Sequence, residues 1–480
     1  MKKSFSDLAT LAPHELWREF SAIAAEVHPS GREHALRAKL YERARAAGLK
    51  AVTDDVGNLR IERRAAPGLE KRPEIILQAH LDMVPQANVD LAFDFLTTPV
   101  TPVIAGSFVT ADGTTLGADN GIGLAAALAL VFDPAFKAGP LALLATVEEE
   151  TSMRGAFHAA PEMLRGDILF NLDSETEGEF YCGCAGGCRL ALRRPVPTTA
   201  AGSEGEAVKI SLLGLQGGHS GMDIDKNRGN AIRMLVEFLL SLDDFAIADF
   251  RGGSLDNAIP RECFTTGLTV SGAKKLQLAA DRFAAYQKNR FDLTEDFGLS
   301  IEPAGRPKRL WSAAVQPEIL WALLAIPNGV IERSASPGAV VTSNNLASAI
   351  FDGHMLTVRN LPRSFDDRKR DHLVEGIREI WKSFGGRARV SQSYPGWKPA
   401  IDSNVVRRAR AVYSELFGAV PPTKVIHAGL ECGIFLEKNP KLAMLSFGPT
   451  IENPHSPAER VDIASVEKFF TFLKKLIVEI

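Results

Sequence analysis

The stretch LALLATVEEE (residues 141–150) is an apolar run of strand length that ends in three consecutive carboxylates. Two other short apolar runs, EIILQA (74–79) and DILFNL (167–172), resemble it. Short apolar runs bounded by polar turns are typical of buried parallel strands, which are apolar on both faces. GIGLAAALALVF (121–132) has the length and composition of a helix that glycines open. Strands that alternate with helices predict an α/β sandwich.

Composition describes an ordinary globular chain. Its 480 residues, 45% hydrophobic and 24% charged, are enough for at least two domains. A net charge of −3 gives no reason to expect nucleic acid or a membrane as the partner. The N-terminus lacks the apolar segment of a signal peptide, and no apolar run is long enough to cross a bilayer. We therefore expect a cytoplasmic protein.

The character of the chain changes twice. A polar Pro/Gly/Ser stretch lies near residue 195, and YPGWKPAIDSN begins at residue 394. Between them, strand-like segments with alternating polarity are separated by helical stretches near 227–243, 273–289 and 366–383. We expect residues 195–394 to form an α+β insert, and residues 1–194 and 395–480 to form one domain around it.

Three of the five cysteines, Cys182, Cys184 and Cys188, crowd into CGCAGGC. Structural zinc sites use paired C-x-x-C spacings with a fourth Cys or His nearby, and this segment has neither. We interpret the three as small, buried or half-buried thiols beside a glycine turn.

His80 and Asp82 follow the first predicted strand, in ILQAHLDMV. Residues two apart lie on one side of an extended chain, and a carboxylate beside a histidine can orient that histidine as a metal ligand. A hydrogen-bonded core pair would have the same pattern, so the pair alone leaves both interpretations open.

Asp119 lies in TLGADNGIG (115–123), a glycine-rich turn ahead of the predicted helix. Glycines that open a helix can cradle phosphate, but this spacing matches neither a dinucleotide fingerprint nor a P-loop. An acid at the centre of the turn would repel phosphate, so a cation is the better ligand.

Asp173 follows the third strand in NLDSE, and His455 lies in GPTIENPHSP after another apolar run. Each could be a helix cap or a loop residue. Together with His80, Asp119 and the glutamates of VEEE, however, they supply five candidate ligands at strand ends of one α/β domain. Such folds build their sites at strand ends, and these ligand types suit zinc or another divalent transition metal.

At this point the sequence resembles the co-catalytic zinc exopeptidases, which include aminoacylase, carnosinase, peptidase T and the aminoacyl-histidine dipeptidases. The resemblance is greatest to the last group and covers nearly the whole chain. It rests on an ordered series of motifs: LQAHLDMVPQ, TLGADNGIG, EEETSMRGA, NLDSE, CAGG, GGHSG, NAIPRE, NGV, YPGW, VIHAGLECG and NPHSP.

The resemblance implies two zinc ions per chain, for which Co²⁺ or Mn²⁺ can substitute. Asp119 would bridge them, His80 and Asp173 would complete one site, and Glu150 and His455 the other. The catalytic residues would be Asp82 and Glu149, with Glu149 as general base on the metal-bridging water. Glu148 would stand outside the site.

The resemblance also implies that the insert is a lid and dimerisation domain that contacts a small peptide substrate. Its substrate-binding residues would be His219, Asn257 and Arg359, and Gly429 in the following segment would offer its backbone. The implied activity is hydrolysis of dipeptides, of the Xaa-His type with broad specificity, by a homodimer.

Other activities remain open. The same metal core serves carboxypeptidases and N-acyl amino acid deacylases, and a degenerate member could bind metal without catalysis. The chain has no G-x-S-x-G elbow and no H-E-x-x-H helix, which weakens serine-hydrolase and zincin alternatives.

Overall fold

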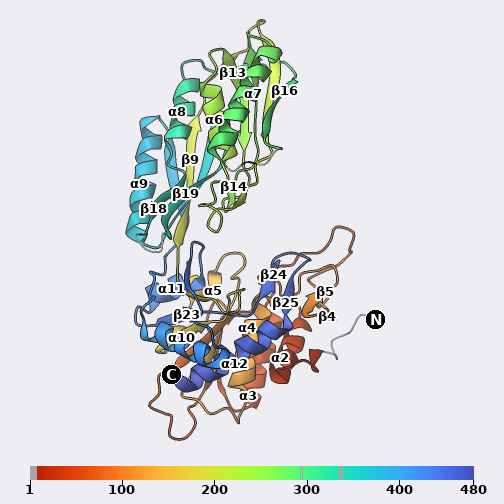
Figure 1. Cartoon of the computed structure of the whole chain (residues 1–480), viewed down its shortest axis with the longest axis vertical. Helices are drawn as coiled ribbons and strands as arrows, with labels where there is room; N and C mark the ends of the chain where they lie inside the picture. Colours follow the sequence, from red (N-terminus) through yellow and green to blue (C-terminus); the bar gives the residue numbers. More distant parts are fainter. Residues whose placement is uncertain (1–7, 292, 294–295, 335–338) are drawn as a thin grey trace. The chain divides into compact units, whose positions relative to one another are not determined.

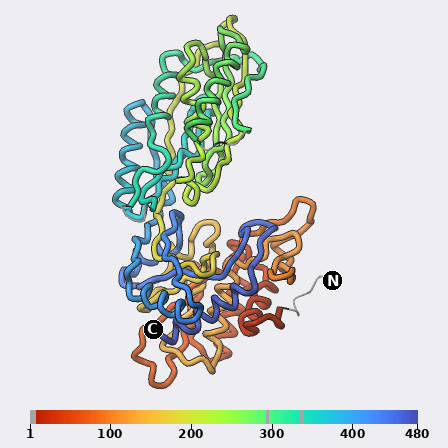
Figure 2. The backbone as a smooth tube through the Cα atoms, in the orientation of Figure 1, coloured from red at the N-terminus to blue at the C-terminus, as the bar shows by residue number. Residues whose placement is uncertain are grey.

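The computed structural model describes residues 8–291, 293, 296–334 and 339–480. The chain forms two compact units. The first contains the chain up to Gly183, Pro399–Val425 and Leu430–Ile480, and the second contains Cys184–Lys398 and Ile426–Gly429. The red-to-orange start and the blue end of the chain therefore fold together in one unit (Figure 2).

The first unit is built on a sheet with the strand order β1-β2-β6-β3-β7-β23-β8-β22. The bounds are β1 Lys50–Thr53, β2 Leu59–Arg63, β3 Ile75–His80, β6 Leu141–Thr146, β7 Ile168–Asn171, β8 Phe180–Cys184, β22 Thr423–Ile426 and β23 Ala443–Ser446. Strand β3 pairs in parallel with β6 and β7, and β23 pairs in parallel with β7. Every residue of β3, β6 and β7 is buried, which confirms the three predicted strands and puts their carboxyl ends at one edge.

Helices pack against this sheet and against one another (Figure 1). They are α2 His14–Ala24, α3 His34–Ala46, α4 Ala118–Val131, α5 Arg154–His158, α10 Asn404–Phe417, α11 Glu431–Lys438 and α12 Ile463–Glu479. Helix α4 packs on β3 and β6, and α2 and α12 pack on α4. All residues of α4 except Asp119 are buried, as expected for a helix that is apolar on every side. The predicted α/β class is confirmed.

A small sheet connects two distant parts of the chain. Its order is β24-β25-β5-β4, with β24 Ile451–Glu452, β25 Arg460–Asp462, β5 Phe108–Ala111 and β4 Pro102–Ala105. Strand β25 pairs antiparallel with β5. The loop between β24 and β25 carries His455, and the chain after β5 leads to Asp119. The small sheet therefore brings together residues that are 336 positions apart.

The second unit contains a larger sheet, ordered β16-β11-β15-β13-β19-β20-β9-β21, with β18 paired to β19. The bounds are β9 Gly186–Pro195, β11 Glu206–Leu213, β13 Phe245–Gly252, β15 Cys263–Thr269, β16 Gly298–Pro303, β18 Gly329–Arg333, β19 Val340–Phe351, β20 Met355–Ser364 and β21 Arg387–Tyr394. Two short pairs accompany it, β10 Thr198–Ala200 with β17 Arg309–Trp311, and β12 Gly218–His219 with β14 Ala258–Ile259. The pairings along the large sheet are antiparallel, so the predicted α+β character is confirmed.

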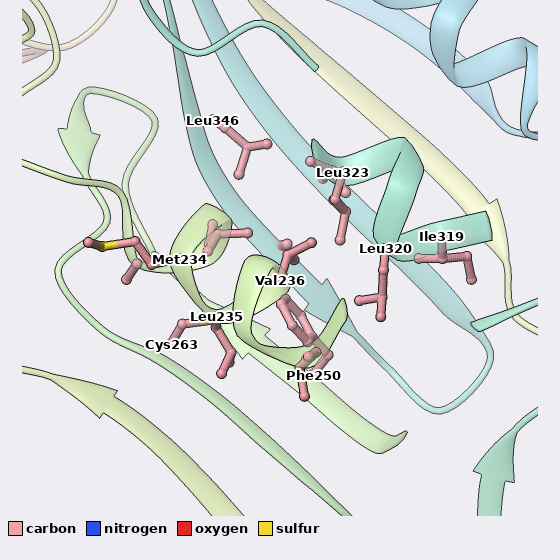
Figure 3. Packing of buried hydrophobic residues seen from close by; sticks show 14 of the residues in the cluster. Met234, Leu235, Val236, Phe250, Cys263, Ile319, Leu320, Leu323 and Leu346 are labelled. Carbon is pink, nitrogen blue, oxygen red and sulfur yellow. The ribbon is translucent and has the colours of Figure 1, made fainter. Parts of the chain in front are cut away.

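Helices supply the rest of the core of the second unit. They are α6 Ala231–Leu240, α7 Ala273–Arg290, α8 Gln316–Ala325 and α9 Asp367–Ser383. Figure 3 shows Leu235 and Val236 of α6 near Leu320 and Leu323 of α8, with Phe250 beneath them. Helix α8 was not predicted, because its sequence is apolar on most sides and lacks the polar face that gives a helical period.

No helix in the described part of the chain combines the length and the apolar character needed to span a membrane.

Candidate metal centre

The end of β3 fixes His80 and Asp82, which are both about 1% exposed. The Nδ1 atom of His80 lies 2.8 Å from the backbone oxygen of Asp82, and 3.4 Å from its Oδ1. An Nδ1–H that donates to this carbonyl leaves Nε2 as the free lone pair. The Asp82 carboxylate also accepts from Ser30 Oγ at 2.7 Å. It therefore belongs to the support of the site.

The three glutamates after β6 have separate surroundings. The carboxylate of Glu148 pairs with Arg154 at 2.8 Å. The backbone N–H groups of Glu149 and Glu150 donate to the two oxygens of Asp82, at 3.0 and 3.2 Å. Asp82 thus holds the turn that carries both residues, while the one nearby arginine is taken by Glu148.

Asp119 lies in the first turn of α4 but does not have helical geometry. Gly117 just before the helix is left-handed, with φ 72° and ψ 27°, and Asp119 itself has φ −84° and ψ 110°. Its two oxygens face different partners. Oδ1 lies 3.3 Å from His80 Nε2, and Oδ2 lies 3.1 Å from His455 Nε2.

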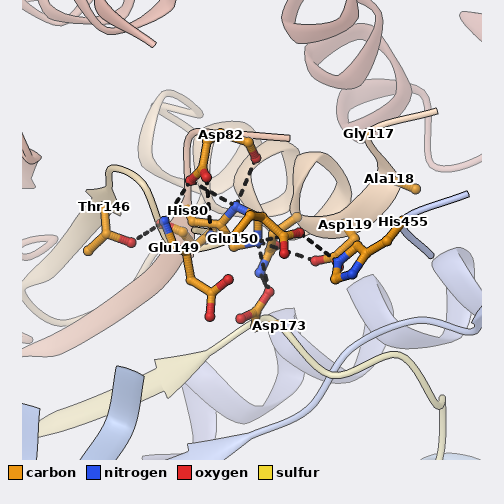
Figure 4. A network of polar contacts seen from close by, with 12 residues as sticks. His80, Asp82, Gly117, Ala118, Asp119, Thr146, Glu149, Glu150, Asp173 and His455 are labelled. Atoms are coloured by element: carbon orange, nitrogen blue, oxygen red, sulfur yellow. Dashed lines mark hydrogen bonds and ion pairs between the residues drawn. The ribbon is translucent and has the colours of Figure 1, made fainter. Parts of the chain in front are cut away.

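Asp173 and His455 complete the cluster. Asp173 Oδ1 is 3.4 Å from His80 Nε2, and Asn120 donates a hydrogen bond to the same oxygen. His455, in a left-handed conformation with φ 59°, places Nε2 2.8 Å from Glu150 Oε1. Figure 4 shows these side chains converging, with the carboxylate of Glu149 beside that of Asp173. We call His80, Asp119, Glu150, Asp173 and His455 the metal centre.

Prediction and structure differ in how the ligands arrive. His80, Glu150 and Asp173 come from the ends of β3, β6 and β7, as expected. Asp119 instead comes from the first turn of α4, and His455 from a loop of the small sheet. The ligands therefore converge from two sheets and one helix.

The protonation of the centre reflects an excess of negative charge. Burial raises the pKa of Glu150 to about 7. Burial also raises the pKa of Glu149 well above its usual value, and the charges of Asp173 and Glu150 add to this effect. Hydrogen bonds with Asp119 and Glu150 raise the pKa of His455 to about 11. Without a cation, the cluster thus retains protons on groups that metal ligation would deprotonate.

The donor set fits divalent cations. Its members form two groups whose ligand atoms lie within 4.8 Å of one another, His80–Asp119–Asp173 and Asp119–Glu150–His455. His80, Glu149 and Glu150 form a third such group. Among the described residues, no Lys or Arg forms an ion pair with these carboxylates, so only the histidines oppose their charge. Imidazole and carboxylate donors without a competing cation are typical of zinc-like sites.

Two buried acids near the centre were missed by sequence reasoning. Glu431, at the start of α11, is 1% exposed, and its Oε2 accepts from Gln78 at 2.6 Å and Thr146 at 2.9 Å. Burial raises its pKa to about 8. Glu459 is 2% exposed and accepts four backbone hydrogen bonds from residues 116–119. The only sequence signal was their place inside quoted motifs or just after them.

The cysteines lie outside the centre. All five are buried and unpaired as disulfides, and burial raises the pKa of Cys182 to about 11. No cysteine belongs to a metal-binding group among the described residues. The interpretation of CGCAGGC as buried thiols is confirmed.

The residues expected in the lid all belong to the second unit. His219 lies in β12 opposite Ala258, so it neighbours the exposed Asn257 in the adjacent β14 segment. Arg359 has a side chain that is 55% exposed and lies 3.9 Å from Asp256. Gly429 packs so closely on Tyr394 that an added Cβ would lie 2.8 Å from its ring, so only glycine fits.

A buried polar cluster surrounds His219 and Gly429. Its members, which we call the second-unit cluster, are His219, Ser343, Arg363, Tyr394 and His427. Arg363, 4% exposed, donates to the Tyr394 hydroxyl at 2.7 Å, and its Nε atom has no partner. Ser343 Oγ lies 2.8 Å from His427 Nε2. Sequence reasoning missed Arg363, which lies four residues beyond Arg359 on β20.

Burial and the charge of Arg363 lower the pKa of His219 to about 4 and that of His427 to about 3. The Nδ1 atom of His219 accepts backbone N–H groups from Gly221 at 3.2 Å and Met222 at 3.1 Å. An accepting Nδ1 puts the single proton on Nε2. His219 is therefore a neutral hydrogen-bond donor at neutral pH.

The fold and this arrangement of ligands define a metallopeptidase of the two-unit type. Residues 76–479 match peptidase family M20/M25/M40, and the chain belongs to this family. It is 40% identical to the cytosol non-specific dipeptidase of Escherichia coli strain K12, over 99% of each chain.

Solved structures agree. The aminoacylhistidine dipeptidase of Vibrio alginolyticus matches with a TM-score of 0.89 and 40% identity, over 98% of this chain and 97% of that one. Human carnosine dipeptidase 1 matches with a TM-score of 0.53 and 12% identity, over 99% and 97%. The second likeness extends to the fold alone.

Proposed function

We propose that this chain is a metal-dependent dipeptidase that hydrolyses Xaa-His and other dipeptides. The observation that carries the proposal is the carboxylate of Asp119, whose two oxygens face His80 and His455 separately. One carboxylate that joins two donor groups is what a two-cation peptidase site requires. The relatives that are 40% identical along the whole chain are dipeptidases by name.

The residues of the metal centre would hold two divalent cations, which we infer to be zinc. His80, Asp119 and Asp173 would hold one, and Asp119, Glu150 and His455 the other. When bound, such a pair polarises the carbonyl group of the peptide bond and lowers the pKa of water.

Glu149 is our candidate general base. Its carboxyl group is buried beside the metal centre, and no side-chain hydrogen bond engages it in the described residues. It can therefore take a proton from the attacking water and return that proton to the leaving amine. The raised pKa of Glu149 suits the second of these two transfers. Asp82 would act as a positioning residue, because it holds His80 and the backbone of the Glu149–Glu150 turn.

The second unit would supply substrate contacts. The Nε2–H of neutral His219 is a candidate donor to the oxyanion that develops during attack. For the C-terminal carboxylate of the substrate, the resemblance favours Arg359, whereas burial favours Arg363. A buried guanidinium with an unpartnered Nε is ready for a carboxylate, and an exposed one on Asp256 is already neutralised. We therefore propose Arg363, with Asn257 and the backbone of Gly429 as further contacts.

We also propose that the chain is a homodimer that works in the cytosol. The support is the name of the Escherichia coli relative for the cytosol, and the resemblance of the insert to a dimerisation domain. Sedimentation of the purified chain tests the dimer, since a monomer at micromolar concentration would contradict it.

A substrate panel tests the proposed activity. Zinc-loaded protein would be assayed on Ala-His, β-Ala-His, Ala-Ala-His and N-acetyl-Ala, with release of the free amino acid as the readout. We expect turnover of the dipeptides and little turnover of the other two. Preferential cleavage of the tripeptide or of the N-acetyl amino acid would instead indicate a carboxypeptidase or a deacylase.

A further inference from the structure

Glu459 is an anion buried inside the loop that carries Asp119. One oxygen, Oε2, accepts the N–H groups of Leu116 at 2.7 Å and Gly117 at 3.1 Å. The other, Oε1, accepts those of Ala118 at 2.8 Å and Asp119 at 3.2 Å. Four consecutive N–H groups around a left-handed glycine form the kind of concavity that binds anions. The glycine-rich turn does cradle an anion, and that anion is the chain's own carboxylate.

Glu459 also belongs to the loop that carries His455. Its backbone N–H donates to Ser456 at 3.0 Å, and β25 begins at the next residue. The Glu459 carboxylate therefore ties the loop of one candidate ligand to the loop of another. His455 and Asp119 are neighbours in the same donor group.

The negative charge at this position is unfavourable for its own sake. Burial raises the pKa of Glu459, and the nearby charge of Asp119 raises it further. A neutral glutamine would avoid this repulsion, but its amide has only one accepting oxygen. Two N–H groups would then face an NH₂ group that cannot accept from them. Only a carboxylate satisfies all four.

We infer that Glu459 is a positioning residue for the Asp119–Glu150–His455 half of the metal centre, through the backbone of residues 116–119. The inference rests on the proposed function for the identity of the ligands. The half formed with His80 and Asp173 depends on Glu459 less, because both of those residues come from strands of the main sheet.

Metal affinity in two backgrounds tests the inference. Asp173→Asn would weaken the first half and leave the second to be measured, and His455→Ala would do the reverse. Zn²⁺ affinity would be measured by competition with a chromophoric chelator, using the full chain. Glu459→Gln should lower the affinity about 10- to 100-fold in the Asp173→Asn background, the usual effect of losing a group that orients ligands. In the His455→Ala background the change should stay near twofold, as for independent sites.

A matched control comes from the small sheet. Glu452 is an exposed acid that pairs with Arg460, and Glu452→Gln should leave both affinities unchanged. Equal losses in the two backgrounds from Glu459→Gln would indicate a general folding role and overturn the inference. No loss in either would overturn it as well.

Chemical rescue provides a second measurement in case Glu459→Gln does not fold. Glu459→Ala removes the side chain and leaves the four N–H groups open to an external anion. Millimolar acetate or formate should restore Zn²⁺ affinity in this variant, while chloride at the same ionic strength should not. Absence of an acetate effect would overturn the inference. Zinc binding by the wild-type chain without dipeptide hydrolysis would overturn the proposed function instead, so the two failures are distinguishable.

Discussion

The metal centre and the second-unit cluster are both buried and polar, but they have opposite charge. In the metal centre, carboxylates gather around two histidines, and burial raises the pKa of Glu150 to about 7. In the second-unit cluster, Arg363 faces no carboxylate among the described residues, and burial with its charge lowers the pKa of His219 to about 4. The first cluster lacks cations and the second lacks an anion. Buried charge that the chain leaves uncompensated indicates the ligand that each site is built to receive.

Removal of metal should have the largest effect on this comparison. A chelator that strips the metal centre should abolish dipeptidase activity, because its anions then have only protons to oppose them. Zn²⁺, Co²⁺ or Mn²⁺ should restore activity, with two ions per chain by metal analysis. Full activity with one ion per chain would contradict a two-cation site.

The next largest effect is expected at the glutamates after β6. Glu149→Gln should leave two ions bound but lower kcat by about 10²- to 10⁴-fold, the usual effect of losing a general base. Glu150→Gln should lower metal occupancy, because it removes an anionic ligand. Glu148→Gln is the control, since its carboxylate pairs with Arg154. Initial rates and metal content of the three variants would decide whether the assignment is displaced by one residue.

The arginine of the second-unit cluster comes third. Arg363→Met should raise KM for dipeptides at least about 30-fold, because loss of the charged partner of a buried carboxylate costs roughly 2 kcal/mol or more. Arg359→Met, at an exposed site on the same strand, should change KM about threefold or less, since surface ion pairs contribute roughly 1 kcal/mol at most. The reverse ranking would return the assignment to Arg359.

The smallest effect is an opposite pH dependence of stability. Glu431 has a pKa raised to about 8 in the folded chain, so its contribution is full below its ordinary pKa and is lost as pH rises through about 8. His427 has a pKa lowered to about 3, so its contribution is present above its ordinary pKa and is lost as pH falls toward 3.

Melting of the metal-free chain against pH measures these contributions. Glu431→Gln should reduce the loss of stability between pH 5 and 8, and His427→Gln should reduce the loss between pH 6.5 and 4. Each change should be on the order of 1 kcal/mol. Bound cations should suppress the first effect but not the second. Identical pH curves for both variants and the parent would contradict the contrast between the two clusters.

Several features were predictable from local patterns. The runs at 74–79, 141–147 and 167–172 became β3, β6 and β7 because an apolar segment of strand length has one favourable place, inside a parallel sheet. Residues at the carboxyl ends of such strands share an edge, so His80 and Glu150 could be expected near each other. The assignment of each ligand to one of two ions came from resemblance.

Other features depended on contacts that no local pattern contains. Glu459 and Leu116 are 343 positions apart, and Gln78 and Glu431 are 353 apart. Neither acid stands out in sequence, because an acid in a loop is usually solvated. The preference for Arg363 over Arg359 has the same origin: the two share a strand and a residue type, and only packing buries one and exposes the other.

The sequence by itself determined which segments become buried strands and helices, and which residues of HLD, ADNG, EEE, LDSE and PHSP can act as ligands. Hydrophobic burial and side-chain chemistry are properties of short segments, so these could be read in order along the chain. Tertiary structure alone decided which acid faces which partner. Pairing β25 with β5 places Glu459 in the turn of Asp119, and the turn after β6 gives Arg154 to Glu148 and leaves Glu149 and Glu150 without a cation. The pKa of a buried group is set by its neighbours in space, and the order of residues does not specify those neighbours until the chain has folded.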